Sequence, residues 1–284
     1  MSTIALTDGD GTLAVVAPRL GGTLQRYVRQ TARGPIEVLH EPGSHLMFPI
    51  AGFSHSGSRI DHYAWEGVER PMPIHGFAMR LPWTVTDVAR SSLRLALGPD
   101  DATRALYPFE FRLGLSYALV EGAIRCVLEV GNVGDRPMPF SAGFHPYIRL
   151  PLTAAGRRDR CVVRLPACRE AFARSQGIEI EESRAPREIA ASLGAAPARS
   201  FADLDRLQAE VIDDGSGHVV GLDASLDAPF RCLTLWSPRP DAPFYCIEPR
   251  TALQDAFTHA AHRQLTVLPP GASFTATMTL SLKG

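Results

Sequence analysis

The sequence has almost no lysine. Of its 29 basic residues, all except Lys283 are arginines. Phosphate-binding loops and Schiff-base mechanisms need a lysine at a defined position, so both kinds of chemistry are disfavoured. The GxGxxG motif between a strand and a helix and the GxSxG nucleophile elbow are also missing from the sequence. We therefore expect no nucleotide cofactor.

A strong net charge and long apolar segments are lacking too. The 29 basic residues nearly balance 30 acidic ones, so no overall field favours nucleic acid or an anionic membrane as a partner. No run of about 18 apolar residues occurs, and the first residues, MSTIALTDGDGTL, lack a basic segment followed by an apolar one. We expect a cytoplasmic monomer or homodimer that acts on a small molecule.

The cysteines do not form a recognisable site. There are five of them, an odd number, and no two are spaced as CxxC, the pattern typical of zinc ribbons and redox centres. We interpret them as small core residues in a reducing compartment. They are Cys126, Cys161, Cys168, Cys232 and Cys246.

The dominant hydrophobic period is two, which is typical of half-buried strands. Apolar residues alternate with polar ones from Phe274 to Lys283, and they do so again in the runs 109–117 and 124–130. Glu121 and Gly122 separate these two runs, which predicts a tight hairpin. Further strands are expected at Leu13–Val16, Leu93–Leu97, Cys232–Trp236, Phe244–Ile247 and Gln264–Leu268.

Many short strand patterns separated by Gly, Pro and Asp predict an all-β fold, a large antiparallel β-sandwich with few short helices. Chains of about 200 to 250 residues often form one such unit, so we expect residues 1–284 to make a single domain. Between 167 and 208 the apolar spacing becomes irregular. Short helical turns are expected there, near Glu188–Leu193 and Phe201–Leu207.

Three segments join an ionisable residue to aromatic and proline neighbours: PIHGFA at 73–78, GFHPY at 143–147 and FYCIEPR at 244–250. His145 and Glu248 each precede a proline, which biases the backbone to an extended conformation and fixes the direction of the side chain. The apolar residues before Glu248 shield its carboxylate from water, as suits a general base.

Each segment also has an ordinary structural interpretation. A single histidine in a β protein is more often a hydrogen-bonded structural residue, and Glu248 could be a strand-end partner for Arg250. Because the three segments occur together, we favour a functional interpretation. The other seven histidines (His40, His45, His55, His62, His218, His259 and His262) lie in polar or turn-rich stretches, and we assign them no chemistry.

These segments resemble the aldose 1-epimerase, or galactose mutarotase-like, family. HGFAMRLPW at 75–83 is similar to its first histidine motif, GFHPYIRLP at 143–151 to its second, and IEPRTALQDAF at 247–257 to its glutamate motif. The Arg59-Ile60 pair, DLDRL at 203–207 and the C-terminal LPPGASFTATMTLSL also resemble family segments. The resemblance spans residues 46–282.

The resemblance implies a β-supersandwich without cofactor or metal, an isomerase that interconverts the α and β anomers of an aldose. It implies that Glu248 removes the anomeric hydroxyl proton and that His145 protonates the ring oxygen, with His75 assisting. Arg59 and Asp205 would bind sugar oxygens. In the altered aspartate motif, Asp203 is the alternative to Asp205.

The segments also depart from the family pattern. Met79 stands where an arginine is expected, and Arg80 follows it, so in a strand Arg80 would face the opposite side; we nevertheless include it among the substrate-binding candidates. Related hexose-6-phosphate epimerases have an arginine- and glycine-rich segment before the first histidine, and here MFPIAGFSHSG replaces it. We therefore rank a free sugar above a phosphorylated one.

Two rival interpretations remain. His75, His145 and Glu248 could form a two-histidine, one-carboxylate site for non-haem iron, although such sites usually contain a closely spaced HxD or HxE pair. A carbohydrate-binding module without catalysis would use the same sandwich and aromatic residues. The presence of both an acid and a base argues against this second alternative.

Overall fold

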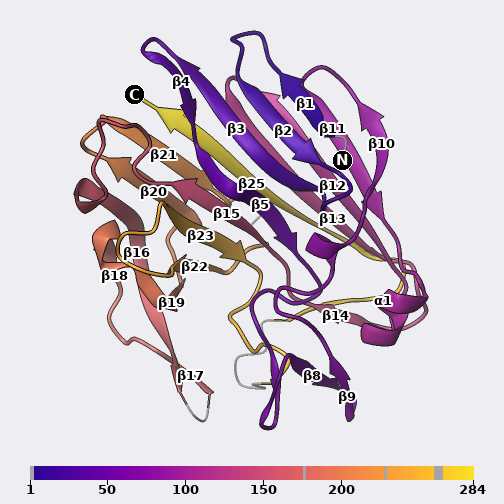
Figure 1. The fold of residues 1–284 in the computed structure, drawn as a ribbon. Coiled ribbons are helices and arrows are strands. Elements are labelled where there is room, and N and C mark those ends of the chain that lie inside the picture. The colour runs from indigo at the N-terminus through magenta and orange to yellow at the C-terminus, as the bar shows by residue number, and fades with distance from the viewer. Residues whose placement is uncertain (1–2, 175–176, 227–228, 259–264) are drawn as a thin grey trace.

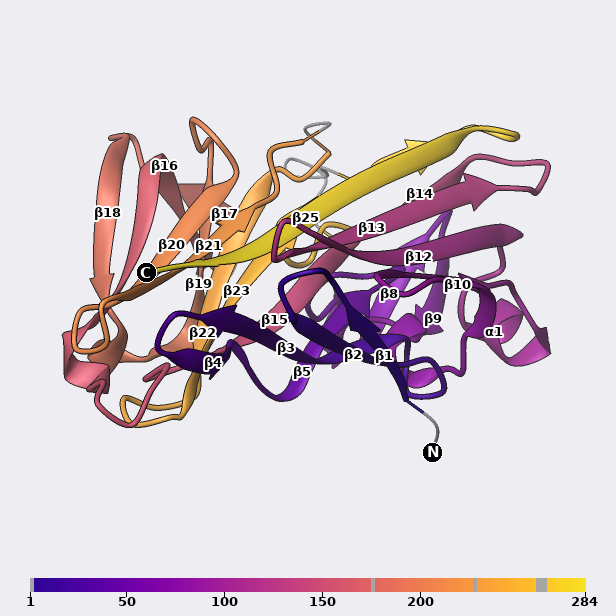
Figure 2. The same ribbon diagram turned by 90° about the horizontal axis from the view of Figure 1, so that it is seen from above.

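Antiparallel strands arranged in two facing layers make up most of the molecule (Figure 1). A computed structural model describes residues 3–174, 177–226, 229–258 and 265–284. Seen from above, strands β1 to β5 lie on one side and β12, β13 and β25 on the other (Figure 2). The predicted all-β sandwich with few short helices is confirmed.

The first layer holds the strands that carry two of the three motif segments. Its strands are β1 (Ile4–Thr7), β2 (Leu13–Ala17), β3 (Thr23–Thr31), β4 (Gly34–Glu37), β5 (Leu39–Met47), β15 (Gly143–Arg149), β17 (Gly177–Ile180), β19 (Ala195–Ala202), β22 (Cys232–Ser237) and β23 (Phe244–Arg250).

The second layer covers the inner face of the first. It consists of β10 (Thr84–Val88), β11 (Ser92–Leu97), β12 (Phe111–Val120), β13 (Ala123–Asn132), β18 (Ala185–Ala190), β20 (Gln208–Asp213), β21 (His218–Asp223) and β25 (Ser273–Lys283). The long strand β16 (Cys161–Arg174) pairs with β19 in the first layer and with β20 in the second, so it joins the two.

Smaller elements lie around the sandwich. The short strands are β6 (His55–Ser56), β7 (Arg59–Ile60), β8 (His62–Trp65), β9 (Val68–Pro71), β14 (Met138–Phe140) and β24 (Thr266–Leu268). The helices are α1 (Asp101–Leu106) and the 3-10 turns η1 (Ala78–Arg80), η2 (Arg158–Arg160) and η3 (Ala191–Leu193). In the described part of the chain, no helix has the length and apolar character needed to cross a membrane.

The strand predictions agree well with the structure. Strands β12 and β13 pair over their whole length, and the turn between them is Glu121-Gly122 with φ values of 51° and 75°. Only glycine adopts this left-handed region without cost, which explains the second turn residue. β24 covers the end of the strand expected at 264–268; Gln264 lies outside the described residues.

The expected helical turns between 167 and 208 are wrong for most of their length. Glu188 lies in strand β18, and only Ala191–Leu193 forms a 3-10 turn. Phe201 belongs to strand β19, which pairs with both β16 and β22. Pairing with neighbouring strands on both sides overrides the weak local preference of this Arg- and Ala-rich segment.

Candidate active site

A row of three ionisable side chains crosses the middle of the first layer. His145 on β15 pairs with His45 on β5. On its other side, Gly143 pairs with Arg250 and Tyr147 with Cys246, which places His145 opposite Glu248 on β23. Glu248 Oε1 lies 3.4 Å from His145 Nε2. Strand register therefore brings together two residues that are far apart in the sequence.

Alternation along β15 explains which side chains face this row. Phe144 and Ile148 point into the core between the layers, whereas His145 and Tyr147 point to the outer face. The extended backbone expected before Pro146 is confirmed by the strand itself. Glu248, which precedes Pro249, likewise lies within strand β23. Both side chains are thus presented by a paired sheet rather than by a loop.

Arg250 fixes the carboxylate of Glu248. Its Nε and Nη2 both donate to Glu248 Oε2, at 3.1 and 2.5 Å, so the other oxygen, Oε1, is directed to His145. The cross-strand residue, Gly143, leaves room for the aliphatic part of the Arg250 side chain, because an added Cβ there would lie 2.6 Å from Met47 Cε and 3.1 Å from Arg250 Cγ. The pairing of Glu248 with Arg250 that the sequence suggested is therefore present, and it is compatible with a functional role for Glu248.

The HGF segment brings His75 to the same place. Gly76 has a φ of +71°, and a Cβ there would lie 2.1 Å from the carbonyl oxygen of Phe48 at the end of β5. The close approach lets the amides of Phe77 and Ala78 donate to that oxygen. The Gly52 amide donates to His75 Nδ1 at 3.1 Å, which assigns the ring proton of neutral His75 to Nε2.

His45, His75 and His145 form a compact group, here called the histidine cluster. The ring centroid of His145 lies 4.8 Å from that of His45 and 5.0 Å from that of His75. Burial, with Arg250 close by, lowers the pKa of His145 to about 3 and that of His75 to about 2. Burial and the neighbouring His145 lower the pKa of His45 to about 3. All three rings are neutral at pH 7.

The cluster and Glu248 line a cavity of about 520 Å³, within the range of about 300 to 1,000 Å³ typical of small-molecule sites. Tyr147, stacked on His145 at 4.7 Å, and Trp236 give it an aromatic wall. Arg80 also lines the cavity. It belongs to the 3-10 turn η1 rather than to a strand, so it shares the cavity with Met79 instead of facing away from it.

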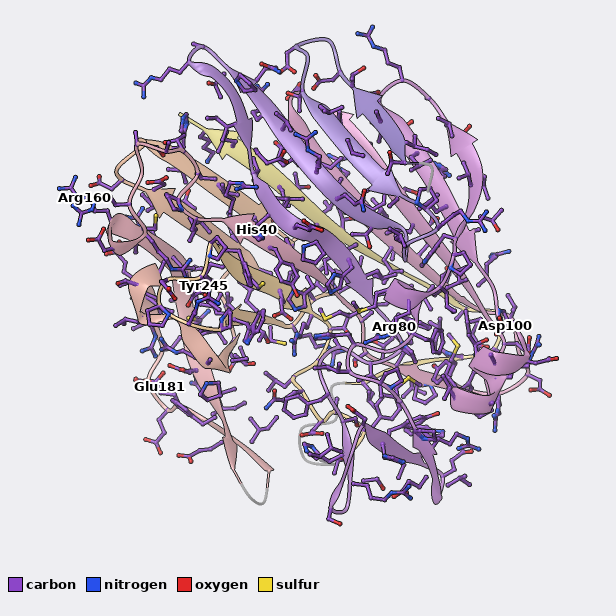
Figure 3. All side chains as sticks on the ribbon, viewed as in Figure 1. His40, Arg80, Asp100, Arg160, Glu181 and Tyr245 are labelled. Atoms are coloured by element: carbon purple, nitrogen blue, oxygen red, sulfur yellow. The ribbon has the colours of Figure 1, made fainter. Side chains whose placement is uncertain are left out.

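Figure 3 places the labelled Arg80 near the middle of the molecule, whereas Asp100 and Arg160 lie at opposite edges.

Among the described residues, no group of three or more His, Cys, Asp or Glu side chains has the arrangement of metal ligands.

Arg59 and Asp205 do not line this cavity. Arg59 lies in the short strand β7, with its side chain 62% exposed and paired with Glu69. Asp205 accepts a hydrogen bond from Arg184 at 2.5 Å and lines a separate surface pocket together with Asp203. Both side chains instead form ion pairs at the surface. The structure does not bring Arg59, Asp205 or the alternative Asp203 to the cavity, and their sugar-binding role stays a prediction.

Sequence reasoning missed His45. It is 5% exposed, and its Nε2 is buried without a hydrogen-bond partner among the described residues. Its place beside His145 follows from the pairing of β5 with β15, which no local pattern encodes. The one usable signal was its position in the apolar run HLMFPI, similar to the setting of His145. His259 and His262 lie outside the described residues.

The histidine cluster predicts a loss of stability in mild acid. An unfolded histidine has a pKa of about 6.5, well above the values near 2 to 3 in the folded protein. As the pH falls below 6.5 the unfolded state binds more protons, so the free energy of unfolding decreases, by at most about 1.4 kcal/mol per histidine per pH unit. Urea unfolding followed by circular dichroism at pH 7, 6 and 5 measures this slope.

The contribution of the cluster is isolated by comparing variants. His45→Gln removes one titrating group and is expected to make the pH dependence of unfolding shallower. His62→Gln, on β8 and outside the cluster, is the matched control. Equal slopes for wild type and His45→Gln would contradict the assignment of a depressed pKa to His45.

Solved structures show the same fold over almost the whole chain. A galactose mutarotase-like protein from Lactobacillus casei ATCC 334 is 25% identical, with a TM-score of 0.81 over 99% of this chain and 100% of that chain. A galactose mutarotase-like protein from Clostridium acetobutylicum is 19% identical, with a TM-score of 0.84 over 99% and 95%. A galactose mutarotase related enzyme from Lactobacillus acidophilus is 18% identical, with a TM-score of 0.82 over 100% and 98%.

The chain has no detectable match among curated protein sequences. A model of the aldose 1-epimerase family, in contrast, matches residues 2–281. Because this match spans nearly the whole sequence and the structure brings the two histidine motifs and the glutamate motif to one cavity, the protein belongs to the aldose 1-epimerase family.

Proposed function

We propose that the protein is an aldose 1-epimerase, a mutarotase that interconverts the α and β anomers of a free hexose. The observation that carries the proposal is the pair formed by Glu248 and His145, 3.4 Å apart and facing the cavity of about 520 Å³. Family membership supports the class of reaction. The absence of a placed lysine fits a reaction that needs only proton transfers.

The reaction opens and recloses a hemiacetal. Glu248 accepts the proton of the hydroxyl on C1 while His145 gives a proton to the ring oxygen, and the bond between C1 and that oxygen breaks. Rotation about the C1–C2 bond then presents the other face of the aldehyde. Reclosure reverses both proton transfers and yields the other anomer, so acid and base are regenerated.

To open the ring, Glu248 and His145 must together carry one proton more than an ionised carboxylate and a neutral imidazole. Before a sugar binds, His145 is neutral at pH 7 because burial and Arg250 lower its pKa to about 3. We expect the reactive complex to take up a proton from solvent, shared between the imidazole and the carboxylate. We expect the His75 Nε2–H and the Arg80 guanidinium, which belong to residues lining the same cavity, to donate to sugar oxygens.

The compartment is proposed from the cysteines. All five are free and buried, as expected of a protein from the reducing cytoplasm.

The proposal is tested by following fresh α-glucose and α-galactose to anomeric equilibrium by polarimetry, with and without purified protein. We expect a catalysed rate that increases linearly with protein concentration and persists after treatment with EDTA. Binding of the sugars without any catalysis would instead favour a carbohydrate-binding module, and loss of the rate with EDTA would favour the metal enzyme. Including glucose 6-phosphate in the screen tests the preference for a free sugar.

A further inference from the structure

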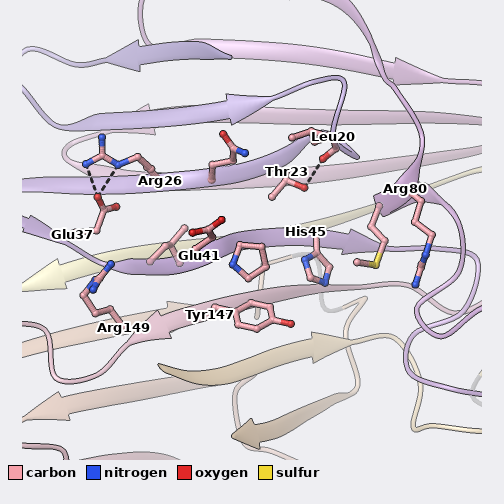
Figure 4. Close-up of a pocket in the computed structure, with 13 residues that line it drawn as sticks. Leu20, Thr23, Arg26, Glu37, Glu41, His45, Arg80, Tyr147 and Arg149 are labelled. Atoms are coloured by element: carbon pink, nitrogen blue, oxygen red, sulfur yellow. Dashed lines mark hydrogen bonds and ion pairs between the residues drawn. The ribbon is translucent and has the colours of Figure 1, made fainter. Parts of the chain in front are cut away.

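His45 is the member of the histidine cluster that has no task in the proposed reaction. Its side chain lines the cavity that holds Glu248. Its ring centroid lies 5.8 Å from that of Tyr147, and Figure 4 shows the two rings on the neighbouring strands β5 and β15, with Arg80 beyond them. A sugar in the cavity therefore meets a third imidazole besides the two that carry the proposed chemistry.

One nitrogen of His45 is buried without a partner in the described part of the chain. This atom is Nε2; in His75, by contrast, Nδ1 accepts a hydrogen bond from the Gly52 amide. Burial and the neighbouring His145 lower the pKa of His45 to about 3, so at pH 7 its ring is neutral and has one donor and one acceptor. Because buried polar atoms are nearly always satisfied in native proteins, we expect a hydroxyl group of the ligand to supply the partner.

Strand register fixes where His45 lies relative to the proposed acid–base pair. His45 on β5 is the cross-strand neighbour of His145 on β15, and Glu248 lies on the other side of His145, on β23. Neighbouring strands are about 4.8 Å apart, which matches the 4.8 Å between the two imidazole centroids. The three side chains therefore follow one another across the layer in the order Glu248, His145, His45.

The atoms of a sugar ring follow a matching order. In an aldohexopyranose the ring oxygen is bonded to C1 on one side and to C5 on the other, and C5 carries the hydroxymethyl group C6. The proposed reaction places the C1 hydroxyl at Glu248 and the ring oxygen at His145. The next side chain of the row, His45, then lies on the C5 side of the sugar.

We propose that His45 forms a hydrogen bond with the C6 hydroxyl of the sugar and thereby makes the protein prefer aldohexoses to sugars that lack this hydroxyl. The inference rests on the proposed function and names a residue that sets its substrate preference. A neutral imidazole can donate to a hydroxyl or accept from it, so the contact satisfies the buried nitrogen. Because this hydroxyl does not react, the contact stabilises the bound sugar and the transition state alike, and its loss raises KM while kcat is unchanged.

The first test needs no variant. 6-Deoxyglucose differs from glucose only in the missing C6 hydroxyl, whereas 2-deoxyglucose retains that hydroxyl. In the wild type we expect kcat/KM for 6-deoxyglucose to be about tenfold lower than for glucose, the upper end for one neutral hydrogen bond, with the difference in KM. Saturation-transfer NMR measures the exchange between the anomers of each sugar.

Substitution of His45 assigns the effect to this residue. His45→Phe keeps a planar ring without nitrogen, and is expected to lower kcat/KM about tenfold for glucose and 2-deoxyglucose but to leave that for 6-deoxyglucose unchanged. His45→Gln has an amide that can replace the hydrogen bond, and is expected to recover part of the preference for glucose. A merely structural role would affect the three sugars equally, so the ratios between sugars separate the two roles.

His218→Phe is the matched control. His218 on β21 is 2% exposed, and its Nδ1 is buried without a hydrogen bond among the described residues, but it does not line the cavity. This variant is expected to keep the wild-type ratios between the sugars. Unfolding midpoints show whether each variant is folded, and the comparison of sugars in the wild type decides the proposal even if His45→Phe does not fold.

The proposal is overturned if the wild type treats glucose and 6-deoxyglucose alike, or if His45→Phe lowers kcat/KM for all three sugars by the same factor. It is also overturned if 2-deoxyglucose alone escapes the effect of His45→Phe, which would place the C2 hydroxyl at His45 instead.

A protein that binds sugars without mutarotating them would contradict the proposed function alone. Saturation-transfer difference NMR then decides the role of His45: weaker binding of 6-deoxyglucose than of glucose supports it, and equal binding contradicts it. If neither binding nor mutarotation is observed, both proposals fail.

Discussion

Glu248→Gln is expected to lower the catalysed mutarotation rate by about 10² to 10⁴, the usual contribution of a positioned general base. The amide keeps the shape of the side chain and can still accept a hydrogen bond from Arg250, but it cannot take up the hydroxyl proton. Sugar binding, measured by saturation-transfer difference NMR, is expected to persist. Polarimetry with fresh α-glucose measures the loss of rate.

The chain provides a matched control for this substitution. Glu170 on β16 is 8% exposed and accepts two hydrogen bonds from Arg199, both 2.7 Å long, so it resembles Glu248 in setting but does not line the cavity. Glu170→Gln is expected to retain the wild-type rate. If both variants were equally active, Glu248 would not be the base.

His145 offers a second readout of the same pair. His145→Asn is expected to reduce the rate to nearly the same extent, because it removes the proton donor to the ring oxygen. In the wild type, kcat/KM is expected to rise by up to about tenfold per pH unit as the pH is lowered from 8 to 6. The reason is that kcat/KM reports the ionisation of the free enzyme. Because the pKa of His145 is lowered to about 3, the protonated fraction of His145 still increases throughout this range. A kcat/KM that increases with pH would contradict the assignment of His145 as the acid.

Arg250→Met is expected to lower the free energy of unfolding by about 3 to 5 kcal/mol, because removing one partner of a buried ion pair leaves an uncompensated charge. Arg250 is 4% exposed and Glu248 only 1%, so water cannot replace the guanidinium. Its loss also removes one of the causes that depress the pKa of His75 and His145, and both are expected to titrate at higher pH. Urea unfolding and NMR titration of the imidazole protons measure the two effects.

Burial accounts for the size of this effect, and two variants test it. Arg250→Lys keeps the positive charge without the two-pronged contact and is expected to lose less stability than Arg250→Met. Arg199→Met breaks another arginine–glutamate pair with two hydrogen bonds, in which Nε and Nη2 donate to separate oxygens of Glu170 and the arginine side chain is 34% exposed. Its loss of stability is expected to be well under that of Arg250→Met. Equal losses at positions 199 and 250 would show that burial does not decide the effect.

Local patterns predicted most of the strands and the chemistry-bearing segments. The alternation in β25 and the Glu121-Gly122 turn depend on neighbours in sequence, as does the extended backbone before Pro146 and Pro249. These features could be predicted because each is determined within a few residues.

Features set by long-range pairing could not be predicted in this way. That His45 stands beside His145 depends on the register of β5 against β15, and that Gly143 makes room for Arg250 depends on β15 against β23. Arg59 was inferred from a motif, but in the structure its side chain is exposed and paired with Glu69 in the β6–β9 region.

A hollow of about 870 Å³ lies beside the candidate active site, over β3, β4, β5 and β15 (Figure 4), and makes the sandwich a convenient scaffold for engineering. Glu248 and His145 are held by paired strands in the middle of the first layer, whereas Gln25, Glu37 and Glu41 line this hollow from β3, β4 and β5. A combinatorial library at these three positions would change the lining of the hollow while the proposed acid–base pair keeps its geometry. Selection for a new ligand could then start from an unchanged pair.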